Sequence, residues 1–105
     1  MKLYYSPKAA KALTEIYEFL CLKNERVAAI IHNDILDGIE RLCIFPQMAP
    51  IEPLLAEEAE MFRSLVINRR YKAIYFIEGE TITVVDIWDC RQNPETLKDR
   101  TTQQK

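Results

Sequence analysis

The sequence predicts one α+β domain, in which an N-terminal helical hairpin packs on an antiparallel sheet in the order β-α-α-β-β-β. Two observations lead to this prediction. Apolar residues recur at helical spacing through residues 9–42, whereas three runs rich in β-branched and aromatic residues follow from residue 62. A meander and a helical hairpin each have one apolar face, and a two-layer domain covers both faces at once.

The N-terminal half contains a short strand and two helices. Leu3-Tyr4-Tyr5 is prone to form a strand, after which Ser6 can cap a helix and Pro7 suits its first position. Asn24 can cap a second helix, which we expect to end at Phe45-Pro46, because a residue before proline avoids the α region. Gly38 inside that helix indicates close packing against a neighbour. The two apolar stripes are Ala9, Leu13, Ile16, Tyr17 and Leu20, and then Val27, Ile31, Ile35, Ile39 and Leu42.

The pattern of the C-terminal half predicts a three-stranded meander. An irregular, proline-containing and acidic connector spans residues 46–60, and strands are expected at 62–67, 71–77 and 81–88. Residues 68–70 and 78–80 have the lengths of hairpin turns. We expect a single domain over residues 1–97, and a polar, mobile tail at 98–105 because that stretch lacks sizeable apolar side chains.

Composition excludes several classes of protein. The 105 residues include 14 Lys and Arg against 16 Asp and Glu, so the chain as a whole is no polycation. No run approaches the roughly 18 apolar residues that cross a bilayer, and the start has no apolar region of a signal peptide. The three cysteines match no disulfide or metal framework, so we expect a reduced, cytoplasmic protein with no metal, cofactor or membrane partner.

The net charge of −2 hides an asymmetry along the chain. Residues 1–60 have 6 basic and 10 acidic side chains, whereas residues 61–105 have 8 basic and 6 acidic ones. The candidate binding residues therefore lie on or beside the meander, where guanidinium groups could clamp carboxylates or phosphates. They are Arg63, Arg69, Arg70, Lys72, Trp88 and Arg91. The alternative is that the basic residues are solvated strand residues that discourage aggregation.

Strand parity leaves the position of Arg63 open. Arg63 shares a face with Leu65 and Ile67, although one face of the sheet should be polar if only one is covered. Either the arginine lies at the margin of the sheet, or both faces are partly covered.

Five segments together resemble the RelE/ParE superfamily of bacterial type II toxin–antitoxin (plasmid stabilisation) toxins. Residues 5–17 resemble its opening helix, and residues 42–46 (LCIFP) the motif that closes its second helix. Residues 62–67 and 71–75 resemble its "R-x-L-x-V" and "Y-R-I-I-Y" strands, and residues 87–94 (IWDCRQNP) its C-terminal "v-l-H-x-R-x-x-P". The likeness spans about residues 3–97.

The resemblance implies a toxin that a cognate antitoxin neutralises in a toxin–antitoxin hetero-oligomer. The long hairpin and its opening motif are similar to the ParE branch, whose characterised members bind DNA gyrase without a catalytic centre. The alternative is a RelE-type endonuclease that cleaves mRNA on the ribosome. In that case Arg63, Lys72 and Arg91 would hold the phosphate, Tyr75 would stack or transfer a proton, and Asp89 would replace the missing histidine base. A third alternative is a degenerate, non-toxic binding module.

Overall fold

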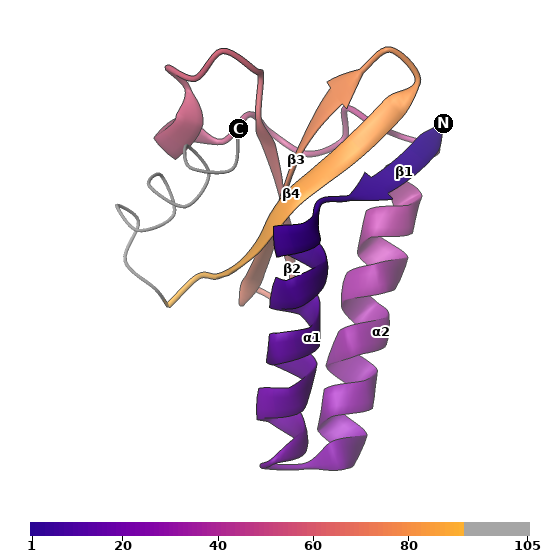
Figure 1. Cartoon of the computed structure of the whole chain (residues 1–105), viewed down its shortest axis with the longest axis vertical. Coiled ribbons are helices and arrows are strands. Elements are labelled where there is room, and N and C mark those ends of the chain that lie inside the picture. Colours follow the sequence, from indigo (N-terminus) through magenta and orange to yellow (C-terminus); the bar gives the residue numbers. More distant parts are fainter. Residues whose placement is uncertain (92–105) are drawn as a thin grey trace.

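The structure, a computed structural model, describes residues 1–91. The expected end of the domain at residue 97 and the expected tail at 98–105 lie outside these residues. Figure 1 shows the order of the elements, which is the predicted one with an added short 3-10 helix in the connector. They are β1 (Lys2–Tyr5), α1 (Pro7–Cys21), α2 (Glu25–Arg41), η1 (Pro53–Leu55), β2 (Arg63–Ile67), β3 (Tyr71–Glu78) and β4 (Thr81–Asp89).

Both predicted helix caps are confirmed. Ser6 Oγ accepts a hydrogen bond from the Ala9 amide at 3.0 Å, and Asn24 Oδ1 accepts one from the Val27 amide at 3.1 Å. Ser6 Oγ also donates to the Val85 carbonyl of β4 at 2.9 Å, so the start of α1 is tied to the sheet. Each cap occupies an amide that the first helical turn would otherwise leave without a partner.

The predicted end of α2 was wrong by four residues. The helix ends at Arg41, not at Phe45-Pro46, and residues 42–44 continue as a tighter turn. The amides of Leu42, Cys43 and Ile44 donate to carbonyls three residues earlier. Hydrogen bonds of this 3-10 type commonly close the last turn of a helix. The α-helix has therefore already ended in this turn before the chain reaches Pro46.

The sheet has the strand order β1-β4-β3-β2 and is mixed. Strands β2, β3 and β4 form the predicted antiparallel meander, and β1 adds a parallel edge beside β4. Both hairpin turns lie where expected. Asn68 and Arg69 have φ angles of 53° and 58°, and Gly79 has a φ of 60°, which is the left-handed geometry that short hairpin turns require.

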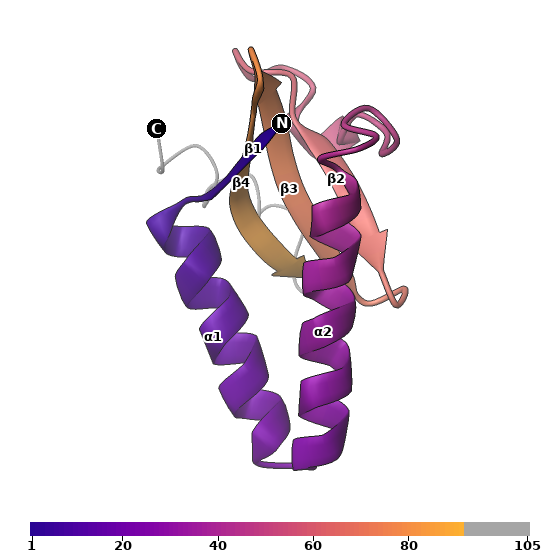
Figure 2. The same ribbon diagram turned by 90° about the vertical axis from the view of Figure 1, so that its right-hand side faces the viewer.

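Both faces of the sheet are covered within the described residues. Figure 2 shows α1 and α2 side by side against one face, with the hairpin reaching past the end of the strands. Ala9 and Ile35 of the helices pack there against Tyr75, Val84 and neighbouring sheet residues. The opposite face carries a second buried cluster, formed by Leu55, Phe62, Ile74, Val85 and Trp88.

Gly38 explains how closely α2 approaches the sheet. A Cβ built on Gly38 would lie 3.2 Å from Ile67 Cγ1 and 3.5 Å from Leu65 Cδ2. The absence of a side chain therefore brings the helix against β2, as the sequence indicated. Among residues 1–91, no helix has both the length and the apolar character that crossing a membrane would require.

Candidate functional site: a groove between the first helix and the end of the sheet

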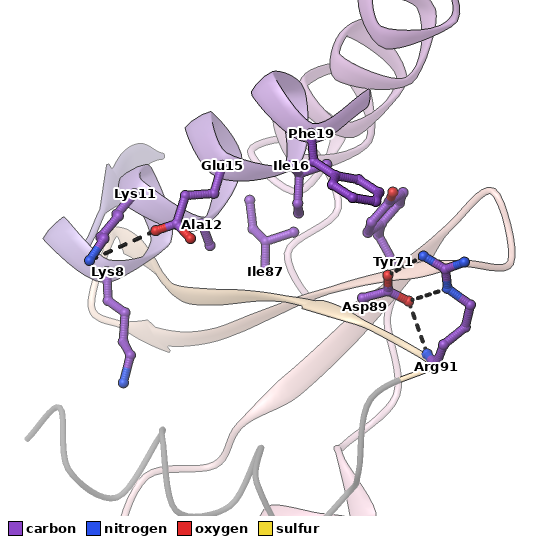
Figure 3. A pocket seen from close by; sticks show the side chains of 10 residues that line it. All are labelled: Lys8, Lys11, Ala12, Glu15, Ile16, Phe19, Tyr71, Ile87, Asp89 and Arg91. Atoms are coloured by element: carbon purple, nitrogen blue, oxygen red, sulfur yellow. Dashed lines mark hydrogen bonds and ion pairs between the residues drawn. The ribbon is translucent and has the colours of Figure 1, made fainter. Parts of the chain in front are cut away.

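A groove of about 470 Å³ runs between α1 and the C-terminal end of β4. Lys8, Lys11, Glu15 and Phe19 line it from the helix, and Tyr71, Ile87, Asp89 and Arg91 from the sheet (Figure 3). Its apolar floor is thus bordered by cationic and anionic groups at both sides. This composition suits a protein partner with its own charged side chains better than a small apolar ligand.

Arg91 is held at the mouth of the groove by Asp89. Its Nε and Nη2 atoms donate to the two carboxylate oxygens of Asp89 at 3.1 and 2.8 Å, and its amide donates to Asp89 Oδ1 at 2.9 Å (Figure 3). The hydrogen bond from Arg91 holds the pKa of Asp89 below its usual value of 3.8. The arginine side chain is still 63% exposed, so its guanidinium is oriented without being hidden.

Two further arginines lie beside this pair. Arg69 and Arg70 occupy the turn between β2 and β3, and the Arg70 carbonyl accepts a hydrogen bond from the Cys90 amide at 2.7 Å. The Arg70 guanidinium lies 5.3 Å from the centre of the Tyr71 ring, which is within cation–π range. Three of the predicted basic residues therefore gather at one end of the sheet.

Arg63 has a different environment, because it holds the connector. Its Nη1 donates to the Ala49 carbonyl at 2.7 Å, with a longer contact of 3.5 Å to the Gln47 carbonyl. The structure thus answers the question of parity: Arg63 lies at the start of β2, on the helix side, where the connector passes. Its guanidinium has backbone carbonyls as partners and does not belong to the groove.

Tyr75 is fully buried next to Arg63. Its hydroxyl donates to the Pro46 carbonyl at 2.8 Å, and burial raises the pKa of the phenol. A buried phenol whose pKa is raised, and whose proton is already donated to a carbonyl oxygen, transfers protons poorly at neutral pH. It acts as a tether for the first residue of the connector.

Lys72 lies on the opposite face of the sheet from Tyr75, since adjacent strand positions alternate. Its Nζ forms an ion pair with Glu52 Oε1 at 2.7 Å. Glu52 is 1% exposed, and its other carboxylate oxygen accepts the Leu54 amide at 3.0 Å. Burial acts to raise the pKa of Glu52, but the bonds from Leu54 and Lys72 outweigh it and keep the pKa below its usual value of 4.5.

Trp88 was among the candidate binding residues, but the structure places it in the core. The indole is 2% exposed and belongs to the buried cluster on the face opposite the helices. Trp88 pairs with Lys72 in the ladder, so it points away from Asp89 and Arg91. It is a core residue in this conformation and offers no surface to a partner.

Two features were missed in the sequence, one in the groove and one in the connector. The groove wall on α1, with Lys8, Lys11 and Phe19, reads as an ordinary solvated helix face. Glu52 reads as one of several acidic residues in the connector, and only Pro53 after it, which suits a first helical position, marks the start of η1.

The five residues considered for a nuclease do not converge on one cleft. Arg63 and Tyr75 face the start of the connector, Lys72 faces Glu52 on the other side, and Asp89 and Arg91 border the groove. Within residues 1–91 there is no cluster of three or more metal-ligating side chains that could hold an ion. What the groove offers chemically is an oriented, exposed guanidinium that can exchange one carboxylate for another.

Comparisons with known proteins agree with the fold. No curated protein sequence matches the chain. A chain of the solved structure described as "Chromosomal ParDE TA system from P. aeruginosa" is similar, with 25% identity and a TM-score of 0.69. The similarity covers 85% of this chain and 95% of that one. The family model described as "ParE toxin of type II toxin-antitoxin system, parDE" matches residues 3–94, and the chain belongs to this family of toxins.

Proposed function

We propose that this toxin inhibits growth by binding DNA gyrase in the cytoplasm, without catalysing a reaction, and that a cognate antitoxin neutralises it in a hetero-oligomer. The observation that supports a non-catalytic toxin is that Arg63, Lys72 and Tyr75 are all occupied by contacts within the fold. All three hold the connector, through the Ala49 carbonyl, the Glu52 carboxylate and the Pro46 carbonyl. A phosphate-cleaving centre needs such groups free and directed at one point.

The groove supplies the recognition surface in this proposal. Asp89 fixes the orientation of the exposed Arg91 guanidinium, and Arg69 and Arg70 lie beside this pair. A carboxylate on the target can take the place of Asp89, since carboxylates bind the guanidinium fork in the same bidentate way. Phe19 and Ile16 add apolar contact at the other wall of the groove. Binding of this kind needs no strong overall positive charge.

The test is expression of the chain without its antitoxin, followed by two measurements on the same cells. Covalent gyrase–DNA complexes are quantified after detergent lysis, and mRNA ends are mapped by primer extension. The proposal expects accumulated gyrase–DNA breaks with intact mRNA, together with inhibition of supercoiling by the purified toxin. Ribosome-dependent mRNA cuts with normal gyrase would identify an endonuclease instead. Normal growth at full expression would identify a degenerate binding module.

Neutralisation is tested separately from the target. The reading frame adjacent to the toxin gene is co-expressed, and the two proteins are co-purified and tested for restored growth. Recovery of growth together with a stable complex supports the antitoxin part of the proposal. Failure of every adjacent frame to bind or rescue contradicts that part, whatever the gyrase assay shows.

A further inference from the structure

The outer edge of β1 carries backbone groups that face away from the sheet. β1 is the last strand of the sheet, with β4 on one side and, within residues 1–91, no strand on the other. The amides of Lys2 and Ser6 donate to the carbonyls of Glu80 and Val84 at 2.8 and 2.9 Å. Alternate residues of a parallel strand bond to the same neighbour, so Leu3 and Tyr5 direct their amides and carbonyls outward.

The sequence of β1 suits pairing with a copy of itself. Two such strands that run antiparallel about a two-fold axis at Leu3 place Leu3 opposite Leu3, and Lys2 opposite Tyr4 of the second copy. A lysine on an edge strand usually discourages pairing. In this register, however, each lysine meets an aromatic ring and not a second lysine, which is a favourable cross-strand pair. Lys2 and Tyr4 are both exposed on the face away from the helices, where they are free to form it.

The end of α2 adds apolar surface beside this edge. Burial raises the pKa of Tyr5, and the nearby Glu40 and Cys43 raise it further, so the last turn of α2 lies next to the Tyr5 side chain. Ile44 and Phe45 follow directly in the chain and are 72% and 64% exposed. Adjacent exposed apolar side chains beside an open strand edge are typical of a surface that a partner covers.

We propose that two copies of this chain associate through their β1 edges as a two-fold symmetric dimer. Leu3 of each copy exchanges two backbone hydrogen bonds with Leu3 of the other, and the two four-stranded sheets join into one of eight strands. The two-fold axis is perpendicular to the sheet, so the helices of both copies lie on the same face. The two ends of α2, with Ile44 and Phe45, approach each other there.

The proposed dimer is independent of the Arg91 groove. β1 pairs with Thr81–Val84 at the start of β4, whereas the groove lies at the other end of that strand. The proposal thus goes beyond gyrase binding, and a toxin that leaves gyrase unaffected can still form the dimer. Each strand contributes only four residues, so the interface is small and the dimer should depend on concentration.

The test is sedimentation equilibrium of the purified full-length toxin over the micromolar range, where a reversible dimer is expected. Tyr4→Lys places a lysine opposite Lys2 of the second copy, and the two-fold axis repeats the pair, so the dimer Kd should rise about tenfold. Val66→Lys is the matched control, because Val66 is 51% exposed on the opposite edge strand and Tyr4 is 54% exposed. A monomeric toxin, a dimer that Tyr4→Lys leaves intact, or a dimer that Val66→Lys dissociates would overturn the proposal.

The double variant Lys2→Glu with Tyr4→Lys tests the register. It replaces each lysine–tyrosine pair by a glutamate–lysine pair, so the dimer Kd should return to within about threefold of the wild type. Circular dichroism should show an unchanged fold, and a folded double variant that stays monomeric contradicts the antiparallel register. Amide exchange identifies the occupant: the Leu3 amide should exchange more slowly as the toxin concentration rises. A Leu3 amide protected only after addition of an antitoxin would show that another chain, and not a second copy, occupies the edge.

Discussion

Arg63 and Tyr75 lie directly opposite each other on β2 and β3, and both donate hydrogen bonds to carbonyls of the connector. In the nuclease interpretation these side chains would have approached a phosphate. Here one cross-strand pair holds the segment that follows α2, and Lys72 holds the same connector from the other face through Glu52. The central sheet residues thus stabilise the fold, and the exposed basic residues are left at the end of the sheet.

Replacement of Tyr75 by Phe tests this assignment. The variant keeps the buried ring but leaves the Pro46 carbonyl without its donor, so the free energy of unfolding should fall by about 1–2 kcal/mol. Urea denaturation followed by circular dichroism measures the change. Tyr4→Phe, at an exposed strand residue, is the matched control and should have no effect. Because Tyr75 is not assigned to the target, Tyr75→Phe should remain toxic; complete loss of toxicity in a folded variant would support a catalytic phenol.

The ion pair between Lys72 and Glu52 predicts an acid-dependent part of the stability. The pKa of Glu52 is lower in the folded chain than its ordinary value of 4.5. A depressed carboxyl pKa contributes stability that is complete above the unfolded value and is lost as the pH falls through the folded value. The difference in unfolding free energy between the wild type and Glu52→Gln should therefore be constant above about pH 5 and shrink below pH 4.5.

Lys72→Met gives the complementary measurement at neutral pH. It leaves the buried Glu52 carboxylate without its cation, and the free energy of unfolding should fall by about 3 kcal/mol, the lower end for a buried pair because Lys72 is 26% exposed. The double variant Lys72→Met with Glu52→Gln should recover part of that loss, because no buried charge remains. A double variant as unstable as the sum of both single variants would show that the two residues act independently.

The left-handed backbone of Asn68 and Arg69, in the turn between β2 and β3, predicts a stabilising substitution. Arg69 has a φ of 58°, which is strained for a side chain with a Cβ. Arg69→Gly should relieve that strain, although glycine also gives the unfolded chain more conformational entropy. The net effect should be a free energy of unfolding that rises by about 0.5–1 kcal/mol. Arg69→Ala removes the guanidinium but keeps the strain, so its stability should match the wild type. If both variants lose toxicity equally, the Arg69 side chain contacts the target; if both remain fully toxic, it belongs outside the recognition surface.

Features decided by neighbouring residues were predictable from the sequence. The Ser6 and Asn24 caps, the hairpin turns and most of the apolar stripes each depend on a few adjacent positions. Two predicted stripe residues, Tyr17 and Val27, are exposed instead. The end of α2 was not predictable, because a 3-10 turn and a helix have the same composition there. The bond between Lys72 and Glu52 joins residues 20 positions apart, and only the path of the connector brings them together.

The candidate site was predictable in part for the same reason. The sequence placed Arg69, Arg70 and Arg91 on or beside the meander, and their proximity follows from the hairpin turns, which bring the end of β4 beside the turn before β3. Trp88 was counted among the binding residues because it is next to polar residues in the sequence, whereas strand alternation directs its ring to the buried cluster on the other face. Parity alone could not place Arg63, since both faces of the sheet are covered.

Arg91 is the residue on which the proposed recognition surface depends most. Arg91→Ala should lower toxicity while the thermal unfolding midpoint stays unchanged, because the side chain is exposed and its partner Asp89 lies at the surface end of β4. Arg91→Lys should recover toxicity only in part, since an ammonium group cannot bind a carboxylate through two parallel hydrogen bonds. Arg26→Ala, at an exposed arginine on α2, is the matched control and should remain toxic. Colony counts after induction and gyrase supercoiling assays measure the effect, and a fully toxic Arg91→Ala would remove Arg91 from the site.

Asp89→Asn distinguishes the two roles of the pair: if Asp89 only orients the guanidinium, toxicity falls, and if Asp89 mainly competes with the target carboxylate, toxicity rises.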